Sequence, residues 1–237
     1  MILKKFFESP WGKTFPILLL FVVGIFFLGK NIPLSDGIRY WKTASDILNG
    51  YQNTAVIESA LLLNGPLYPF ILAVFKGIGF TVKATIYLNA IFLYVAFTYF
   101  FKTAHLFLVQ KEALIVTYVL VLIDPFLFYW GAKLYSEPLA ILWVCLLINL
   151  LTKYFKSPTK KTLYWAALIF CLLALTRVIF AYVLLVFIPL GFLGYYLFKK
   201  ELFKSIAKLG GFGILFLVPY LIFTYSITNK VFYLSGN

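Results

Sequence analysis

The run FPILLLFVVGIFFLG, residues 15–29, contains no charged side chain and decides the class of fold. It lies within an apolar segment at about 13–30, close to the roughly 20 residues that a helix needs to cross a bilayer. The whole chain shares this character, because 63% of its 237 residues are hydrophobic and only 12% are charged. That balance lies far outside the range of soluble domains. The sequence therefore predicts an all-α, polytopic membrane protein.

Seven apolar runs are long enough to predict transmembrane helices. They cover about 13–30, 84–103, 112–127, 134–153, 162–177, 178–198 and 208–228. The run PLYPFILAVFKGIGF at 66–80 is different, because a helix of this length is about 22 Å long and the hydrocarbon core is roughly 30 Å thick. It predicts a helix that lies in the interface or dips into it. No repeat or linker marks a second domain, so residues 1–237 are expected to form one transmembrane domain with interfacial helices at about 31–80.

The lysines predict the orientation in the membrane. If the N-terminus is cytoplasmic and 66–80 does not span, 13 of the 21 basic residues lie inside and five of the eight acids lie outside. The inside set is Lys4, Lys5, Lys13, Lys102, Lys111, Lys153, Lys156, Lys160, Lys161, Lys199, Lys200, Lys204 and Lys208. Because cytoplasmic loops carry an excess of basic residues, we expect a multi-pass protein of the cell membrane with its N-terminus inside and its C-terminus outside.

The net charge, the two cysteines and the N-terminal segment bear on nucleic-acid binding, disulfide formation and signal cleavage. The formal net charge is +13, but the basic residues are scattered between apolar blocks, which argues against nucleic-acid binding. Cys145 and Cys171 lie in apolar runs and are expected to be free thiols without a role. The segment GKNIPLSDG after the first run lacks a small-x-small cleavage pattern, so we expect a retained anchor in place of a cleaved signal.

The longest polar stretch, SDGIRYWKTASDILNGYQN at 35–53, follows the first predicted span. On a helical projection one side holds Ile38, Trp41, Ala44, Ile47 and Leu48, and the other holds Arg39, Lys42, Thr43, Asp46 and Asn49. With Ser35 and Gly50 placed to cap its ends, this pattern predicts an amphipathic helix on the outer surface. Asp36 falls in the first turn, where the helix dipole favours a carboxylate. Its position alone suits helix capping as well as chemistry.

Two more acids are expected on the same outer face. Asp124 ends the third predicted span, in LIDPF, and Glu137 opens the fourth, in YSEPLA. Carboxylates at membrane depth are costly and tend to be functional. Local roles remain open for both, because Asp124 suits an Asp-Pro turn and Glu137 suits a helix start after Ser136.

Basic side chains on that face point to an anion. Arg177 lies alone between two apolar runs, where a guanidinium either snorkels to lipid headgroups or binds an anion. Arg39, Lys42 and Lys133 share its predicted side of the membrane, so these four side chains could together hold a phosphate.

Other chemistries find little support. His105, the only histidine, is expected at the cytoplasmic end of the second span, away from the acids named above. The sequence has no Gly-rich nucleotide loop, His and Cys metal cluster or nucleophile elbow. Nucleotide-dependent chemistry is therefore not expected, no cofactor is assigned, and a divalent cation is left open.

Six segments in order resemble the GT-C membrane glycosyltransferases, specifically the group of aminoarabinose transferases and protein O-mannosyltransferases. They are SDGIRYWKTASDILNG, NGPLYPFILAVF, the LN of YLNAIF, LIDPFLFYWGAKLYSEPLAILW, LALTRVIF and VPYLIFTYSITNKVFYLSGN. The resemblance extends along essentially the whole chain. Family members are usually longer, so this chain corresponds to their N-terminal seven-span core, to a short member or to a subunit that needs a partner.

The resemblance implies a catalytic carboxylate in the first outer loop, followed by a tyrosine, a small residue and a glycine. This pattern falls on Asp36, Tyr40, Ala44 and Gly50. The position where family members often have a second acid is Gly37 here. The Ser-Glu that opens the fourth span matches Ser136 and Glu137, and the family arginine after the fifth span matches Arg177.

The resemblance further implies transfer of a sugar from a polyprenyl-phosphate carrier to a lipid, glycan or protein acceptor on the outer face. Asp36 would take the acceptor's proton, and Arg39, Lys42 and Arg177 would hold the donor phosphate. The segment around Tyr68 would form an apolar shelf beside the lipid tail. Two alternatives stay open: a non-catalytic relative that binds or moves polyprenyl-linked lipids, and a small-solute transporter, for which half-repeats are missing.

Overall fold

The computed structural model describes residues 2–29, 36–50, 65–198 and 201–228, and these residues form helices without any strand. The helices are α1 (Ile2–Glu8), α2 (Pro10–Leu28), α3 (Asp36–Leu48), α5 (Leu67–Gly77), α6 (Val82–Ala104), α7 (Gln110–Ile123), α8 (Pro125–Gly131), α9 (Glu137–Lys156), α10 (Lys160–Thr176), α11 (Ile179–Phe198) and α12 (Glu201–Thr228). Ser35, Lys199 and Lys200, which were named above, lie outside the described residues. The all-α prediction is confirmed for the part of the chain described.

Helices occupy all seven predicted spans, but not all of them are long enough to cross a membrane. Among the described residues, α2, α6, α9, α11 and most of α12 are five helices with the necessary length and apolarity. The pair α7 and α8 makes a sixth if it counts as one span, although it bends by 70°. α10 has 17 residues and is about 26 Å long. The chain is thus a polytopic helical membrane protein, and the count of seven spans stays a prediction.

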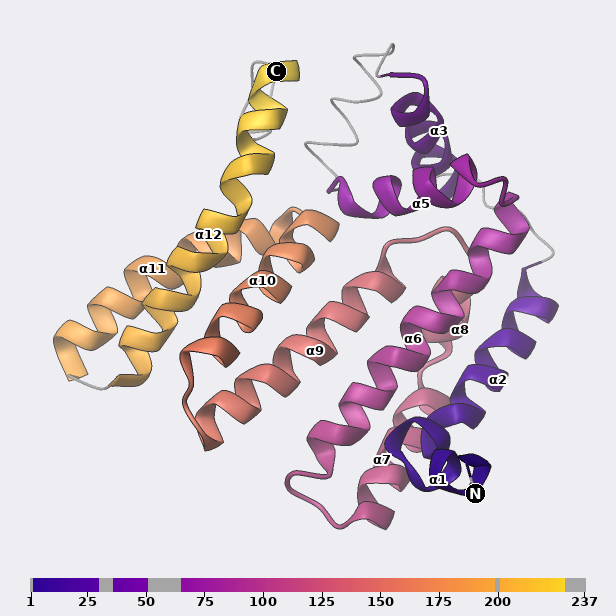
Figure 1. Ribbon diagram of the computed structural model, residues 1–237, viewed down its shortest axis with the longest axis horizontal. Coiled ribbons are helices and arrows are strands. Elements are labelled where there is room, and N and C mark those ends of the chain that lie inside the picture. The colour runs from indigo at the N-terminus through magenta and orange to yellow at the C-terminus, as the bar shows by residue number, and fades with distance from the viewer. Residues whose placement is uncertain (1, 30–35, 51–64, 199–200, 229–237) are drawn as a thin grey trace.

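The helices form a bundle with two distinct ends (Figure 1). α3 and α5 lie at one end, which is also the end that the last turn of α12 reaches, and this is called the α3 end below. α1 and the connection from α6 to α7 lie at the opposite end, called the α1 end. With 11 residues, α5 is about 17 Å long, too short to span, and it lies across the bundle end as an interfacial helix would.

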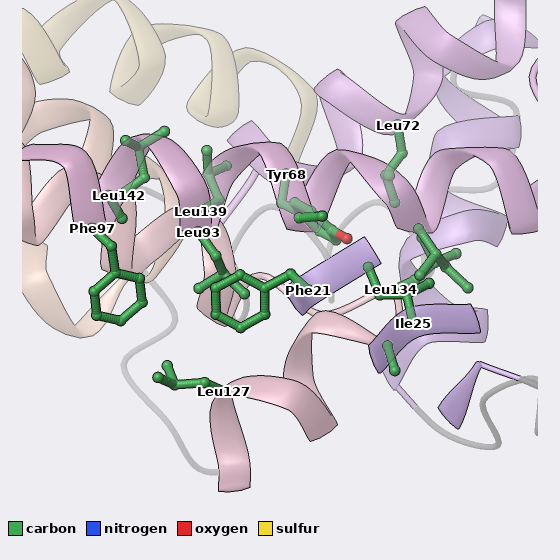
Figure 2. Close-up of a cluster of buried hydrophobic side chains, with 14 of the residues drawn as sticks. Phe21, Ile25, Tyr68, Leu72, Leu93, Phe97, Leu127, Leu134, Leu139 and Leu142 are labelled. Carbon is green, nitrogen blue, oxygen red and sulfur yellow. The ribbon is translucent and has the colours of Figure 1, made fainter. Parts of the chain in front are cut away.

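One hydrophobic cluster joins α2, α6 and α9 to the short helices α3 and α5. Figure 2 shows side chains of this cluster from α2, α5, α6 and α9. Phe21 of α2 stacks on Phe97 of α6 with ring centroids 6.2 Å apart. Tyr68 and Leu72 of α5 lie among these side chains and are each 1% exposed. Because α5 buries its own apolar side chains in this cluster, the bundle core fixes the position of α5 at the α3 end.

A second cluster joins α10, α11 and α12, and small residues let its helices approach closely. A Cβ atom added to Gly191 of α11 would lie only 2.5 Å from the backbone nitrogen of Ala207 in α12. Contacts of this kind are typical of helix pairs in membranes, where close backbone packing drives association. Cys145 belongs to the first cluster and Cys171 to the second, and both are free thiols.

The amphipathic helix predicted after the first span is present as α3, and part of its predicted polar side is buried. Thr43, on that side, is 2% exposed, and Tyr40 and Ala44 are at most 3% exposed, whereas Leu48, on the predicted apolar side, is 48% exposed and stays open to surrounding lipid. The reason is that α3 packs on α5 in place of lying alone on the membrane. Thr43 tolerates burial because its hydroxyl donates to the carbonyl of Arg39 at 2.9 Å.

Candidate functional site

Side chains from α3, α9 and α10 meet at the α3 end. The hydroxyls of Tyr40 and Ser136 are 3.2 Å apart and form a buried hydrogen bond. The next residue, Glu137, accepts a hydrogen bond from Nη2 of Arg177 at 3.1 Å, and the two form an ion pair. Residues separated by 40 to 96 positions in the sequence are therefore brought into one polar cluster.

Each of these side chains is placed by the local structure of its helix. Pro138 at the second position of α9 cannot continue a preceding helix, so α9 starts here and leaves Ser136 and Glu137 at its first turn. Ser136 does not cap α9 with its side chain, and its hydroxyl bonds to Tyr40 instead. α10 ends at Thr176, and Arg177 leaves the helix in an extended conformation that turns toward α9.

A second set of hydrogen bonds holds α5 and the segment before α9 in place. Tyr68 donates to Oδ1 of Asn89 at 3.4 Å. The amide of Asn89 donates in turn to the carbonyls of Lys133 at 2.5 Å and Gly131 at 3.4 Å. Asn89 is completely buried in α6. It thus connects three separate segments, and the rings of Tyr68 and Tyr40, 5.2 Å apart, join it to the polar cluster.

The N-terminal side of α5 packs tightly against the end of α10. Gly65 has φ of +79°, a backbone conformation that favours glycine, and an added Cβ would lie 2.5 Å from the carbonyl oxygen of Leu175. Trp143 of α9 donates to the hydroxyl of Thr176 at 3.1 Å. These contacts fix the end of α10 from which Arg177 extends.

Asp36 and Arg39 form the accessible part of the site. Their charged groups are 3.7 Å apart, and the two side chains are 53% and 49% exposed. Lys42, one turn further along α3, is also exposed. A carboxylate with this exposure can reach a molecule that arrives from the aqueous phase, whereas Glu137, at 23% exposure, lies deeper and is held by Arg177.

Burial, one hydrogen bond and three charged groups together set the pKa of Tyr40. Burial raises the pKa of Tyr40 above its ordinary value of 10.0, and its hydrogen bond to Ser136 opposes this. The carboxylates of Glu137 and Asp36 raise the same pKa, and the guanidinium of Arg177 lowers it. Burial likewise raises the pKa of Tyr68. Both tyrosines are therefore neutral hydrogen-bonding groups at physiological pH.

Two predicted site residues do not join the cluster. Asp124 lies at the bend between α7 and α8, where its carboxylate accepts from the backbone N–H of Phe126 at 2.9 Å and caps α8. The local turn alternative therefore accounts for it. The Lys133 ammonium lies 3.7 Å from the centre of the Tyr129 ring, and only its backbone carbonyl takes part in the contacts of Asn89. The other predicted site residues all lie at the α3 end: Asp36, Arg39, Tyr40, Lys42, Tyr68, Glu137 and Arg177.

Asn89 and Ser136 are the residues whose contacts the sequence did not predict. An amide within an apolar run was the available signal for Asn89, because a buried polar side chain needs partners. His105 is the C-cap of α6, at the α1 end and away from this cluster, as expected, and the cytoplasmic location of that end stays a prediction. Within the described residues no three or more His, Cys, Asp or Glu side chains gather as a metal site would require.

Comparison of the chain with protein-family models, curated proteins and solved structures finds no match.

Proposed function

We propose that this chain is a membrane glycosyltransferase of the GT-C type. It would move a sugar from a polyprenyl-phosphate donor to a lipid, glycan or protein acceptor at the outer face of the membrane. The observation that supports this most is the meeting of Asp36, Tyr40, Glu137 and Arg177 at one end of the bundle. These are residues on which the sequence resemblance rests, and they come from three helices.

The geometry suits an acceptor and a lipid-linked donor that approach from different phases. In the proposed reaction an acceptor hydroxyl attacks the anomeric carbon of the sugar, and Asp36 takes the proton from that hydroxyl. The bond between the anomeric carbon and the phosphate oxygen breaks, and the polyprenyl phosphate leaves with the electron pair. Arg39 and Lys42, exposed on the same helix, would stabilise the charge that develops on the leaving phosphate.

Glu137 and Arg177 have supporting roles in this proposal. Arg177 uses Nη2 to reach Glu137, and a guanidinium has five N–H donors in a planar fork, so it could bind the donor phosphate while paired. Glu137 orients that fork. The bonded pair of Ser136 and Tyr40 fixes α3 against α9 and thereby sets the position of Asp36.

Gly37 favours a second candidate function. Family members often have a second acid at this position, and here a buried glycine follows Asp36 directly. A site with a single exposed carboxylate could bind a polyprenyl-phosphate lipid without transferring its sugar. The two functions predict the same ligand and differ in turnover.

The test is a reconstituted assay with a polyprenyl-phosphate sugar in proteoliposomes, which follows donor binding and release of polyprenyl phosphate separately. The glycosyltransferase proposal expects both, with Arg177→Gln raising the KM for the donor and Glu137→Gln lowering turnover partially. Binding without release supports the second candidate. If Glu137→Gln abolished turnover and Asp36→Asn retained it, the roles of the two acids would be the reverse of those proposed, and the absence of any binding would refute both functions.

A further inference from the structure

α12 begins with a pattern that combines charge and small residues on one face. In ELFKSIAKLGGFGILF, residues 201–216, Lys204, Lys208, Gly211 and Leu215 recur at intervals of three or four. This spacing places them on the same side of a helix. Two cations, a glycine and an apolar side chain therefore follow one another along α12 away from its N-terminus.

That face of α12 forms a groove with α11. A cavity of about 670 Å³ lies between the two helices and is lined by these four residues and by apolar side chains of α11, including Ile188 and Phe192. Phe192 and Leu215 are 67% and 63% exposed, so the apolar part of the groove opens toward the surroundings of the bundle. Figure 1 shows α11 and α12 on the side of the bundle away from α2 and α6.

A second cavity of about 340 Å³ adjoins the first and adds another cation. Lys208 and Phe212 line both cavities, and Lys160 at the start of α10 lines the second. The ring of Tyr164 lies 4.5 Å from that of Phe212, so the wall between the cavities is fixed. Lys160 and Lys208 therefore lie around one hollow at the end of the apolar groove.

The cations of this hollow are largely unpaired within the described residues. Glu201 pairs with Lys204 at 3.5 Å. The ion pairs of the described residues do not include Lys160 or Lys208, and both side chains are exposed. A groove with a positive end and an apolar body is complementary to a molecule with an anionic head and an apolar tail.

We propose that this groove binds an anionic membrane phospholipid, with its phosphate at Lys160 and Lys208 and an acyl chain along α12 toward Leu215. The length fits, because α12 rises about 11 Å over the seven steps from Lys208 to Leu215, which stays within one leaflet, half of the roughly 30 Å hydrocarbon core. The site is separate from the candidate functional site, since Lys160 begins α10 and Arg177 follows its end. The lysines contribute headgroup selectivity and the groove contributes tail burial.

The first test uses the full chain in detergent micelles and measures binding of dioleoyl phosphatidylglycerol and dioleoyl phosphatidylcholine by native mass spectrometry. The phosphatidylglycerol should bind more tightly. The double variant Lys160→Gln/Lys208→Gln should weaken its binding about 30-fold, because each lysine near an anionic lipid contributes about 1 kcal/mol and 1.4 kcal/mol is a factor of ten. The matched control Lys5→Gln/Lys111→Gln changes two exposed lysines on α1 and α7 and should alter binding less than twofold.

A second variant tests the tail. An added Cβ at Gly211 meets no atom within 4 Å, and Gly211 lines the groove, so Gly211→Leu places its side chain in the groove and leaves both lysines in place. It should weaken phosphatidylglycerol binding at least fivefold, and 10-fold excess inorganic phosphate should not displace the lipid. The proposal would be overturned if wild type bound phosphatidylglycerol and phosphatidylcholine equally tightly, or if Gly211→Leu bound phosphatidylglycerol as tightly as wild type. An equal loss of binding in the control variant, or displacement of the lipid by inorganic phosphate, would overturn it as well.

Discussion

Asn89 offers the sharpest test of how the α3 end is held together. Its buried amide donates to the carbonyls of Lys133 and Gly131 and accepts from the hydroxyl of Tyr68. Asn89→Leu keeps the approximate volume of the side chain and removes all three contacts. The carbonyl of Gly131 and the hydroxyl of Tyr68 then lose this partner in an apolar interior, whereas the carbonyl of Lys133 keeps its bond from the backbone N–H of Tyr135 at 2.9 Å.

The expected cost follows from the geometry. The contact to Lys133 is short, at 2.5 Å, and the other two are long, at 3.4 Å, so we count one strong and two weak hydrogen bonds. A net hydrogen bond contributes about 1 kcal/mol, and a buried polar group left without a partner costs about 1 to 3 kcal/mol. Asn89→Leu should therefore lower the free energy of unfolding by about 2 to 4 kcal/mol.

Asn149 is the matched control. It is also a buried amide on a long helix, but within the described residues it donates only to the hydroxyl of Thr103, which has its own bond to the carbonyl of Tyr99. Asn149→Leu should cost about 1 kcal/mol. Unfolding by SDS in mixed micelles, followed by circular dichroism, measures both values. A difference of less than about 0.5 kcal/mol between the two variants would refute the role given to Asn89.

Three further predictions concern packing, protonation and topology. Gly65→Ala should destabilise the chain by about 2 kcal/mol or more, because Gly65 combines a positive φ with close contact to α10. Gly79 also has a positive φ but has open space around its Cβ, so Gly79→Ala should cost about 1 kcal/mol in the same unfolding assay. Burial raises the pKa of Tyr40 above 10.0. The stability that neutral Tyr40 contributes is therefore complete below about pH 10 and is lost as the pH rises through the folded-state pKa. Between about pH 9 and pH 11.5, the melting temperature of Tyr40→Phe should fall less than that of wild type. Cysteines placed at Asp46 and Lys160 should be labelled from opposite sides of the membrane, outside and inside respectively; labelling of both from one side would contradict the topology.

The fold was predictable from the sequence wherever the pattern of apolar residues was long. The helices at the seven predicted spans and the short α5 follow from run length and from the prolines at 66 and 69. The burial of Thr43 on α3 was not predicted, because a helical projection separates polar from apolar residues and does not include the partner helix. Burial of Thr43 depends on α5, which lies further along the sequence.

The residues of the candidate site could be predicted from the sequence, whereas most of the contacts between them could not. The shared face of Asp36, Glu137 and Arg177 follows from the lysine distribution, and the ion pair of Glu137 with Arg177 joins two of them. The local role of Asp124 could not be separated from a site role in advance, because an Asp-Pro pair suits both. The bond between Ser136 and Tyr40 depends on how α3 docks, which no local pattern encodes.

The central claim is that Asp36 serves as the general base, and one comparison of transfer rates tests it. Asp36→Asn keeps the size of the side chain, and Asp46→Asn makes the same change nearly three turns along α3, away from the cluster. Both variants should fold and insert like wild type. In proteoliposomes with a polyprenyl-phosphate sugar, Asp36→Asn should lose about 100-fold to 10,000-fold in turnover, and Asp46→Asn should stay close to wild type. Near-normal turnover of Asp36→Asn would contradict the account and leave α3 as a surface helix.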